Sequence, residues 1–439
     1  MASTYLTRSV SSTGNRKKWT WSGWLKRGNL GSNYIMSSNN GSNQYSMLQF
    51  DSANVLRYYD YTNDYQTQLK TTRVFRDTSA WYHIVFAYDS AQSTASDRVK
   101  VYVNGTQETS FGTSSYPSQD YDSFMNLSGV PHYIGRETGT GSLYDGVMSH
   151  VHFTDGYAYA ASDFGSTDAT TGEWKIKTVP SVSYGTNGYF MFKDDNSVND
   201  DSGNGNNFAV SAGTLTKTED NPSNVFATFN SLNPTNPDFS NGNNTLTRSS
   251  NSWKPAWTTI GASSGKYYCE MDWDSGSNFT VGFSTADVPG SNPTLDDIVG
   301  NPSNGGYLTV LYENGVIYNN GSSAGAYGSG SSYATGDIMM LAMDLDNNKF
   351  YFGKNGTWFN SADPANNTGG YAINASYTNS TWCFTACVYG TGSWHGNFGN
   401  GYFGTTAVSS AGTNASNIGI FEYNVPTGYT ALSTKGLNE

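Results

Sequence analysis

The chain has 439 residues and a formal net charge of −12, and its aromatic residues (15%) outnumber its charged ones (13%). Aromatic residues suit pleated surfaces and the 49 Gly supply turn conformations, so this composition predicts a globular all-β protein. It excludes a helical bundle, which needs abundant Ala, Leu, Glu and Lys, and it excludes a disordered chain and a collagen.

Short strands separated by tight-turn dipeptides fill the first half of the chain. In Trp19–Leu25, an alternation of period two places Trp19, Trp21 and Leu25 on one face, as in a half-buried strand. We predict strands at Trp19–Leu25, Tyr34–Met36, Ser46–Phe50, Val55–Tyr59, Trp81–Tyr88, Val99–Val103, Tyr133–Ile134, Gly146–Phe153 and Tyr189–Lys193. Short strands at this spacing predict a β-sandwich over residues 1–212.

The composition changes after this first domain. Residues 213–250 are rich in Asn, Pro, Ser and Thr and poor in apolar residues, which predicts an extended connector. Further strands are predicted at Lys266–Trp273, Phe279–Ser284, Tyr307–Tyr312, Val316–Tyr318, Ile338–Leu345, Lys349–Phe352, Thr381–Tyr389 and Gly396–Phe398. They define a second domain at 251–405. Residues 406–439 have few periodic apolar positions, so we expect a C-terminal strap or attachment segment there.

The two halves share one hairpin pattern. Trp81–Asp89 is followed by Val99–Thr106, and Gly336–Asp344 is followed by Lys349–Thr357. Each pair reads as a buried strand, a polar turn and an aromatic strand that ends in Asn-Gly, a dipeptide favoured in hairpin turns. The repeat predicts two tandem antiparallel jelly-roll β-sandwiches joined by the Asn/Pro-rich connector.

The same segments resemble known families. The first half resembles laminin-G or concanavalin-A-like lectin domains at Trp19–Lys26, Trp81–Asp89, Val101–Gly105, Tyr133–Arg136 and Gly146–Phe153. The second half resembles a SPRY domain at Gly265–Asp272, Val281–Phe283, Gly336–Asp346 and Lys354–Trp358. Both resemblances imply sandwiches that are used for recognition, and neither implies catalysis.

The pairing of these domains, with the ending Pro426–Leu432, is similar to virion proteins of marine tailed bacteriophages. That resemblance implies a non-enzymatic protein of the virion surface, either a tail fibre or adhesin or a capsid decoration. Its expected partners are other virion proteins or a host surface glycan, and a homo-oligomer on the particle is expected. Two alternatives remain, a polysaccharide-cleaving tail enzyme and an intracellular SPRY protein that binds peptides.

Charge and hydropathy bear on other partners. Proteins that bind nucleic acids cluster cations against phosphates, but the dense basic runs Arg16–Lys18 and Lys26–Arg27 only bracket an expected strand. We therefore expect no nucleic acid partner. The longest apolar stretch, Ile338–Met343, is far too short to cross a bilayer, so no membrane insertion is expected.

The three cysteines indicate the compartment in which the chain folds. Cys383 and Cys387 lie four residues apart on one expected strand, which is about 13 Å and beyond disulfide reach. Buried free thiols, which are typical of a reducing compartment, are the expected state, with Cys269 as the remaining possible partner. Residues 1–30 lack the pattern of a signal peptide, so we expect synthesis in the host cytoplasm and release in a virion.

Glu270 and Asp274 are the candidate catalytic residues of the enzyme alternative, with Asp272 between them at the position of a helper carboxylate. Carboxylates at i, i+2 and i+4 of a strand lie on one face and would point into one groove. Retaining glycosidases place two carboxyl groups about 5–5.5 Å apart in this manner. The motif of the jelly-roll glycosidases ends in Glu where this chain has the shorter Asp274, which argues against cleavage.

Two segments have residues that ligate metals in other proteins. His150 and His152 share a strand face at a spacing seen in some zinc sites, with Asp155 as a third ligand, but the strand also fits the laminin-G pattern without metal. Asp194–Asn207 offers many oxygen ligands for calcium, yet it lacks the spacing of an EF-hand loop and suits a polar interdomain turn. We expect no metal and no cofactor.

The aromatic residues divide into core and candidate ligand-binding positions. Trp19, Trp21, Phe86 and Phe352 follow the inward period. Aromatic rings on rigid loops can stack on sugars or anchor interfaces. The candidate ligand-binding residues lie in the second domain and are Trp273, Tyr312, Tyr318, Asn355, Trp358, Trp394 and His395. The alternative is that these loop aromatics fold back over the edges of the core.

Overall fold

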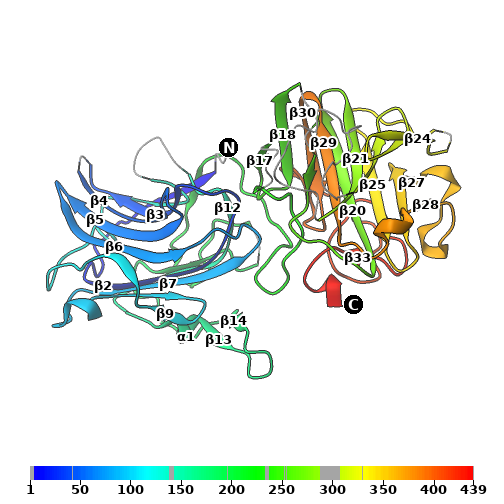
Figure 1. Cartoon of the computed structure of the whole chain (residues 1–439). Coiled ribbons are helices and arrows are strands. Elements are labelled where there is room, and N and C mark those ends of the chain that lie inside the picture. Colours follow the sequence, from blue (N-terminus) through cyan, green and yellow to red (C-terminus); the bar gives the residue numbers. More distant parts are fainter. Residues whose placement is uncertain are drawn as a thin grey trace. The chain divides into compact units, whose positions relative to one another are not determined.

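A computed structural model describes residues 4–41, 43–137, 143–194, 196–232, 237–251, 253, 255–286, 307–328 and 330–438 (Figure 1). Strands dominate the chain, and α1 (Ala161–Phe164) is the one α-helix among the described residues. The chain divides into two compact units, which we name the N-terminal unit (Ala2–Lys217) and the C-terminal unit (Thr218–Glu439). The prediction of an all-β protein built from antiparallel sheets is confirmed.

The N-terminal unit contains two large antiparallel sheets (Figure 1). The eight-stranded sheet has the order β10 (Phe111–Ser115), β6 (Tyr65–Val74), β5 (Val55–Thr62), β4 (Gln44–Phe50), β3 (Asn33–Asn39), β11 (Pro131–Ile134), β1 (Tyr5–Ser9) and β16 (Ala209–Ala212). The six-stranded sheet has the order β15 (Tyr189–Met191), β12 (Gly146–Asp155), β2 (Lys18–Arg27), β7 (Trp81–Asp89), β8 (Val99–Val103) and β9 (Thr106–Glu108). β13 (Gly165–Thr167) pairs with β14 (Trp174–Ile176).

The core of the N-terminal unit lies between its two sheets. Trp19, Trp21 and Phe86 are buried in it, as the alternation predicted. The ring of Trp19 stacks on Tyr88 at a centroid distance of 5.0 Å and an interplanar angle of 6°. The other face of the six-stranded sheet is covered too, because Phe164 of α1 and Trp174 of β14 pack with Val85 of β7.

The C-terminal unit is also built from two large sheets. The first has the order β17 (Asp238–Ser240), β18 (Thr245–Ser250), β30 (Gly390–Asn397), β20 (Lys266–Ser275), β25 (Ile338–Asp344), β26 (Lys349–Lys354) and β27 (Thr357–Trp358), with β28 (Tyr371–Ala372) on β26 and β33 (Thr430–Ala431) on β20. The second has the order β19 (Ala256–Trp257), β29 (Trp382–Val388), β21 (Phe279–Thr285), β22 (Leu308–Tyr312), β23 (Val316–Asn319) and β24 (Ser322–Ala326). β31 (Tyr402–Phe403) pairs with β32 (Thr406–Ala407).

Five short 3₁₀ helices complete the described secondary structure. They are Ala95–Asp97, Phe359–Ser361, Pro364–Asn366, Ala375–Tyr377 and Gly436–Asn438. No helix in the described ranges has the length and apolar character needed to span a membrane. The three cysteines are free and buried, as expected.

The prediction of an extended connector at 213–250 is wrong for most of this segment. The C-terminal unit starts at Thr218, and Phe226, Phe229 and Leu246 are buried within it. β18 forms six register pairs with β30, from Thr245 opposite His395 to Ser250 opposite Gly390. The segment has few apolar residues, but those few enter the core, so the segment folds with the second domain.

The expected boundary at residue 405 is also wrong, because the following segment belongs to the fold of the C-terminal unit. Phe421, Val425 and Tyr429 pack on the outer face of the larger sheet, against Tyr268 of β20 and Tyr351 of β26. β33, near the end of the chain, pairs in parallel with β20. Whether residues 406–439 attach the protein to anything else stays a prediction.

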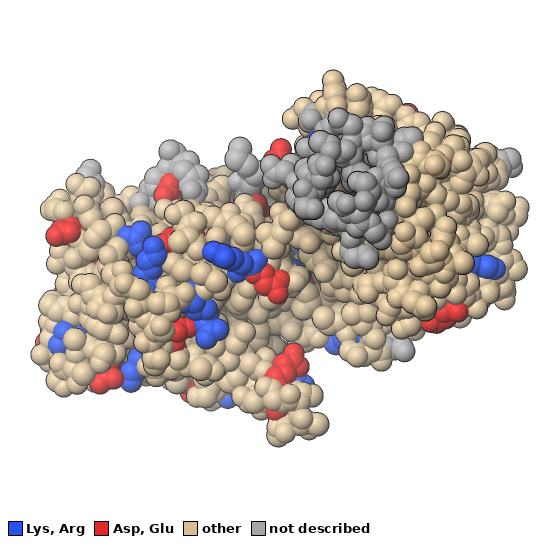
Figure 2. All heavy atoms as spheres, viewed as in Figure 1, with Lys and Arg blue, Asp and Glu red and all other residues tan. Residues whose placement is uncertain are grey.

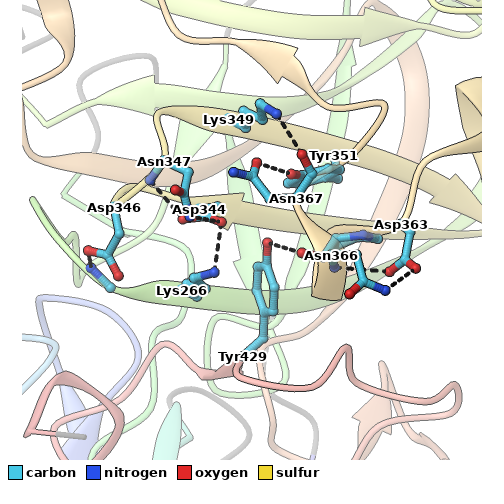
Figure 3. A network of polar contacts seen from close by, with 12 residues as sticks. Lys266, Asp344, Asp346, Asn347, Lys349, Tyr351, Asp363, Asn366, Asn367 and Tyr429 are labelled. Atoms are coloured by element: carbon cyan, nitrogen blue, oxygen red, sulfur yellow. Dashed lines mark hydrogen bonds and ion pairs between the residues drawn. The ribbon is translucent and has the colours of Figure 1, made fainter.

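A polar network fixes one edge of this covered face (Figure 3). The Lys266 ammonium lies 3.0 Å from the buried Asp344 carboxylate, which also accepts a hydrogen bond of 2.9 Å from the Asn347 side chain. The ring of Tyr429 lies beside Lys266, with 5.7 Å from the ammonium to the ring centroid. The Tyr429 hydroxyl donates to the Pro364 carbonyl at 3.4 Å. These contacts hold the C-terminal segment on its sheet.

Candidate functional site

The strand β5 places a row of large side chains on the outer face of the eight-stranded sheet. Its residues Leu56, Tyr58 and Asp60 are buried. Because side chains alternate along a strand, Arg57, Tyr59 and Tyr61 point to the opposite face. The sequence of β5 therefore builds a core face and an aromatic outer face at once.

Neighbouring strands extend this outer face. In the antiparallel register, Tyr45 of β4 and Tyr65 of β6 both lie opposite Tyr61. Tyr34 of β3 lies opposite Gln49, which lies opposite Arg57. We call the group formed by Tyr34, Tyr45, Arg57, Tyr59, Tyr61 and Tyr65 the tyrosine face.

The rings of the tyrosine face contact one another. Tyr45 and Tyr61 are stacked, with a centroid distance of 5.0 Å and an interplanar angle of 11°. Tyr65 meets Tyr61 edge-on at 5.2 Å and Tyr59 at 5.7 Å. Such pairs add roughly 0.5–1.5 kcal/mol beyond their burial, so the rings are held in place before any ligand arrives.

The face is accessible to ligands, although its rings differ in exposure. Tyr65 is 43% exposed, Tyr34, Tyr45 and Tyr61 are half-buried, and Tyr59 is buried. Burial and the neighbouring Glu137 carboxylate raise the pKa of Tyr34 to about 12, and burial raises the pKa of Tyr45. Their hydroxyls therefore stay protonated at neutral pH and can donate as well as accept hydrogen bonds.

Arg57 lies among these rings. The centre of its guanidinium is 4.5 Å from the centroid of Tyr59 and 5.3 Å from that of Tyr65, and it donates a hydrogen bond of 2.9 Å to the Tyr65 hydroxyl. It forms no ion pair with a carboxylate in the described part of the chain. Its charge is therefore stabilised by ring faces and left available to a ligand.

The tyrosine face was not among the predicted sites, although the sequence contains one signal for it. The predicted strand Val55–Tyr59 stops before Tyr61, and the predicted ligand-binding residues all lie in the second domain. Continuing the alternation of period two from Arg57 through Tyr59 to Tyr61 identifies an aromatic face opposite Leu56 and Tyr58.

Two of the predicted ligand-binding residues are buried in the core of the C-terminal unit. Trp273 is 4% exposed and Trp394 is 0% exposed. They lie opposite each other on β20 and β30, and Trp273 packs on Phe279 at a centroid distance of 4.3 Å. The prediction that they bind a ligand is wrong, because both lie within strands and face the inner side of the sheet.

Tyr312 and Tyr318 are brought together in another place. Both are half-buried, and their ring centroids are 6.2 Å apart. Trp253 approaches Tyr312 edge-on at 5.8 Å, and the Tyr312 hydroxyl donates to the Asn278 side chain at 2.8 Å. Tyr318 packs with Leu308, Val310 and Cys387. A role of these two tyrosines in binding stays a prediction.

Asn355 and Trp358 lie elsewhere in the C-terminal unit. Asn355 is exposed and ties its turn to Asp337 by a hydrogen bond of 2.7 Å. Trp358 is half-buried and packs edge-on against Tyr268 and Tyr351, beside the C-terminal segment. These positions fit the alternative in which Trp358 covers an edge of the core.

His395 lies beside the acidic residues of β20. Its Nδ1 is 3.4 Å from an oxygen of Asp272, and its Nε2 is 4.0 Å from one of Asp274. Asp274 also accepts a hydrogen bond of 2.6 Å from the Ser393 hydroxyl. The structure therefore brings His395 together with Asp272 and Asp274, and separates it from Tyr312 and Tyr318, which lie on the other sheet.

Glu270 does not share an open groove with Asp274. Its buried carboxylate accepts hydrogen bonds of 2.8 Å from the backbone N–H groups of Glu422 and Tyr423, and one of 2.9 Å from the Tyr268 hydroxyl. These hydrogen bonds lower the pKa of Glu270, but burial has the larger effect and raises it to about 7. The expectation that these carboxylates point into one groove is wrong for Glu270, because the C-terminal segment covers it.

The metal candidates are occupied by other contacts. His152 stacks on Phe190 at 4.0 Å and shares a hydrogen bond of 2.9 Å with the Tyr184 hydroxyl, and burial lowers the pKa of His150 to about 4. In the segment 194–207, of which residue 195 lies outside the described residues, Asp200 accepts three backbone N–H groups. Within the described ranges, no group of three or more His, Cys, Asp or Glu is arranged to hold a metal ion.

The chain was compared with curated proteins and with solved structures. A search of the curated proteins found no match. Among solved structures, the chain is similar to the SPRY domain of human HERC1 (18% identity, 36% of this chain and 91% of that chain, TM-score 0.28). It is similar to domains LG4-5 of the mouse laminin alpha1 chain (9% identity, 89% and 84%, TM-score 0.29). It is similar to domain 4 of AbnA, a GH43 extracellular arabinanase of Geobacillus stearothermophilus in complex with arabinotriose (14% identity, 33% and 64%, TM-score 0.26).

The family comparison concerns the N-terminal unit. Residues 2–162 contain every member of the tyrosine face, and this part of the chain matches the laminin G family described as the concanavalin A-like lectin/glucanases superfamily.

Proposed function

We propose that the N-terminal unit recognises carbohydrate and that the tyrosine face binds it. The observation that carries the proposal is the stacked pair Tyr45–Tyr61 with the exposed Tyr65 beside it, on the outside of a rigid sheet. Aromatic rings fixed in this way can stack on the apolar face of a sugar ring. The match of residues 2–162 to a lectin-like family supports the same function.

Polar groups next to the rings support the same ligand class. The tyrosine hydroxyls and the guanidinium of Arg57 offer hydrogen-bond donors. Gln68 of β6 lies opposite Tyr59 and is half-buried, so its amide can reach a ligand on the rings. Sugars present apolar faces and hydroxyl groups together, and the tyrosine face matches both features.

The test is glycan binding by the full chain, first on a glycan array and then by calorimetry. We expect the double variant Tyr45→Ala/Tyr61→Ala to lose about tenfold or more in affinity, because it removes the stacked pair. Tyr157→Ala is the matched control, since Tyr157 is 42% exposed and stacks on Tyr159 outside the tyrosine face. Equal losses in both variants, or no glycan binding by the unaltered chain, would contradict the proposal.

The proposal is one of binding without catalysis. The covered Glu270 argues against the particular pair Glu270 and Asp274 as hydrolytic residues, because a substrate cannot reach the Glu270 carboxylate. Incubation of the full chain with the glycans that it binds, followed by a reducing-sugar assay, is expected to release no new ends. A time-dependent release would contradict this part of the proposal.

The location of the protein is proposed from the resemblance in sequence. We propose that it lies on the surface of a phage particle, as a tail fibre or a capsid decoration, forms a homo-oligomer there and contacts other virion proteins. Mass spectrometry of purified particles, followed by antibody labelling under the electron microscope, tests this. Absence of the chain from intact particles would contradict it.

A further inference from the structure

We infer that the ligand of the tyrosine face is an acidic oligosaccharide whose carboxylate or sulfate group binds Arg57 while a neighbouring sugar stacks on Tyr45, Tyr61 and Tyr65. This inference rests on the proposed function and adds the charge and the minimum length of the ligand. It comes from three observations, which are the partners of Arg57, its distance from the stacked rings and the charge of the unit around it.

The bonding of Arg57 differs from that of Lys70, Arg73 and Arg98 in the same unit. The ammonium of Lys70, which lies opposite Arg57, is 2.7 Å from the Asp51 carboxylate, and Arg73 is 2.7 Å from Glu108. Arg98 donates to three backbone carbonyls. Arg57 donates to the Tyr65 hydroxyl, and its buried Nε has no hydrogen-bond partner among the described residues.

The surroundings of Arg57 favour a bound anion. Two tyrosine rings exclude water from its sides, and a guanidinium in a partly dry site attracts an anion more strongly than one in bulk water. Its planar fork of N–H donors matches the oxygens of a carboxylate or a sulfate in a bidentate pair. The nearby Glu137 carboxylate interacts with the Tyr34 hydroxyl, and among the described residues Arg57 forms no ion pair with it.

The spacing along β5 sets the length of the ligand. The backbone positions of Arg57 and Tyr61 are about 13 Å apart on one strand, and their side chains are separated by the ring of Tyr65. A sugar stacked on the Tyr45–Tyr61 pair therefore leaves Arg57 to the acidic group of a linked neighbour. Tyr65 contacts both residues and joins the two positions. The geometry points to at least two linked sugars.

The charge of the N-terminal unit is compatible with an anionic ligand. It has 17 Lys and Arg against 19 Asp and Glu, whereas the C-terminal unit has 6 against 16. On the face of the N-terminal unit drawn in Figure 2, basic and acidic side chains are interspersed. An acidic glycan therefore meets much less repulsion on this unit than on the other.

The experiment measures binding of the full chain to oligogalacturonates of increasing length and to their methyl esters, which have the same backbone without the charge. A parallel pair, dextran sulfate and dextran, distinguishes sulfate from carboxylate. We expect binding from the disaccharide upward, with the charged form bound about tenfold or more tightly than its neutral form in at least one pair.

Arg57→Gln is expected to abolish the preference for the charged form, because it removes the charge that pairs with the anion. The affinity for the neutral form should fall by a smaller factor, since the Gln amide keeps a hydrogen-bond donor. Arg57→Lys keeps a charge and should retain part of the preference, which guards against a variant that fails to fold. Arg76→Gln removes an exposed arginine outside the tyrosine face and serves as the control.

Two outcomes overturn the inference while leaving the proposed function in place. One is equal affinity of the unaltered chain for charged and neutral forms, and the other is an unchanged preference in a folded Arg57→Gln variant. If Tyr45→Ala/Tyr61→Ala loses binding of the neutral ligands but keeps binding of the charged ones, the tyrosine face binds uncharged sugars and the inference is overturned as well. If the unaltered chain binds none of these four ligands and no glycan of the array, both the inference and the proposed function are overturned.

Discussion

The two units share a sandwich plan but differ in which sheet face they leave open. In the N-terminal unit, the segment with α1 and β14 covers the six-stranded sheet, and the tyrosine face of the other sheet is left at the surface. In the C-terminal unit, the chain's own C-terminal segment packs on the outer face of the larger sheet. An aromatic sheet face thus becomes a binding surface or a second core according to whether another part of the chain covers it.

The buried polar groups show the same difference. On the covered face of the C-terminal unit, Glu270 and Asp344 are buried with hydrogen-bonding or ionic partners. On the tyrosine face, Arg57 has a hydroxyl and two rings as its partners. Saturated polar groups indicate a structural role, whereas a charge with unused donors is available to a ligand.

The largest expected effect is on the stability of the C-terminal unit. Trp394→Ala should lower its free energy of unfolding by about 3–5 kcal/mol, because it removes a fully buried ring. Urea unfolding followed by tryptophan fluorescence measures the loss. Trp358→Ala is the matched control and should cost less, since Trp358 is half-buried. Equal stability of Trp394→Ala and the unaltered chain would show that the ring is not part of the core.

A second variant tests how the covered face is held. Glu270→Ala leaves the backbone N–H groups of Glu422 and Tyr423 without their acceptor, so we expect a loss of about 1.5–3 kcal/mol. Hydrogen exchange should show faster exchange at residues 418–432 first. If the loss instead appears only in the strands of the N-terminal unit, the assigned role of Glu270 is wrong.

The carboxylate of Glu270 should also make the stability of the fold depend on pH. Burial raises the pKa of Glu270 to about 7 in the folded state, so the folded protein binds a proton there more tightly than the unfolded one. The contribution to stability is present below about pH 4.5 and is lost as the pH rises through 7, on the order of 1–3 kcal/mol. Melting curves from pH 5 to 8 should show this slope in the unaltered chain and a smaller slope in Glu270→Ala. An identical slope in both would contradict the assignment.

The smallest expected effect concerns the tyrosine face. Tyr65→Phe removes the hydroxyl that accepts a hydrogen bond from Arg57 and keeps the ring. Because Tyr65 is exposed, we expect the free energy of unfolding to change by less than about 0.5 kcal/mol. Affinity for the acidic oligosaccharide should change by only a few-fold. A loss of stability as large as that of Trp394→Ala would show that this face is part of a core.

The alternation of apolar and polar residues predicted much of the fold correctly. It identified strands in both units and the inward rings Trp19, Trp21, Phe86 and Phe352. It failed at 218–250 and 406–439, where apolar residues are sparse and not periodic. Their partners lie far away in the sequence, as Glu270 and Tyr423 do at a separation of 153 residues. Local patterns carry no information about such contacts.

The candidate site was less predictable from the sequence. Trp394 occurs near Gly and Ser, which suggested a loop, and Trp273 was expected at the end of a strand, but both lie within strands and are buried. The period of two along β5 predicts that Tyr59 and Tyr61 point outward. The sequence does not predict which aromatic face stays uncovered, because that depends on where the segments at 156–185 and 406–438 fold.

Tyrosine footprinting of the full chain tests the contrast between the two units most directly. The chain is labelled with a tyrosine-selective reagent, with and without a saturating acidic oligosaccharide, and digested for mass spectrometry. We predict protection of Tyr45, Tyr61 and Tyr65 and unchanged labelling of Tyr312 and Tyr318. Protection of Tyr312 and Tyr318 with unchanged labelling of the tyrosine face would contradict the account.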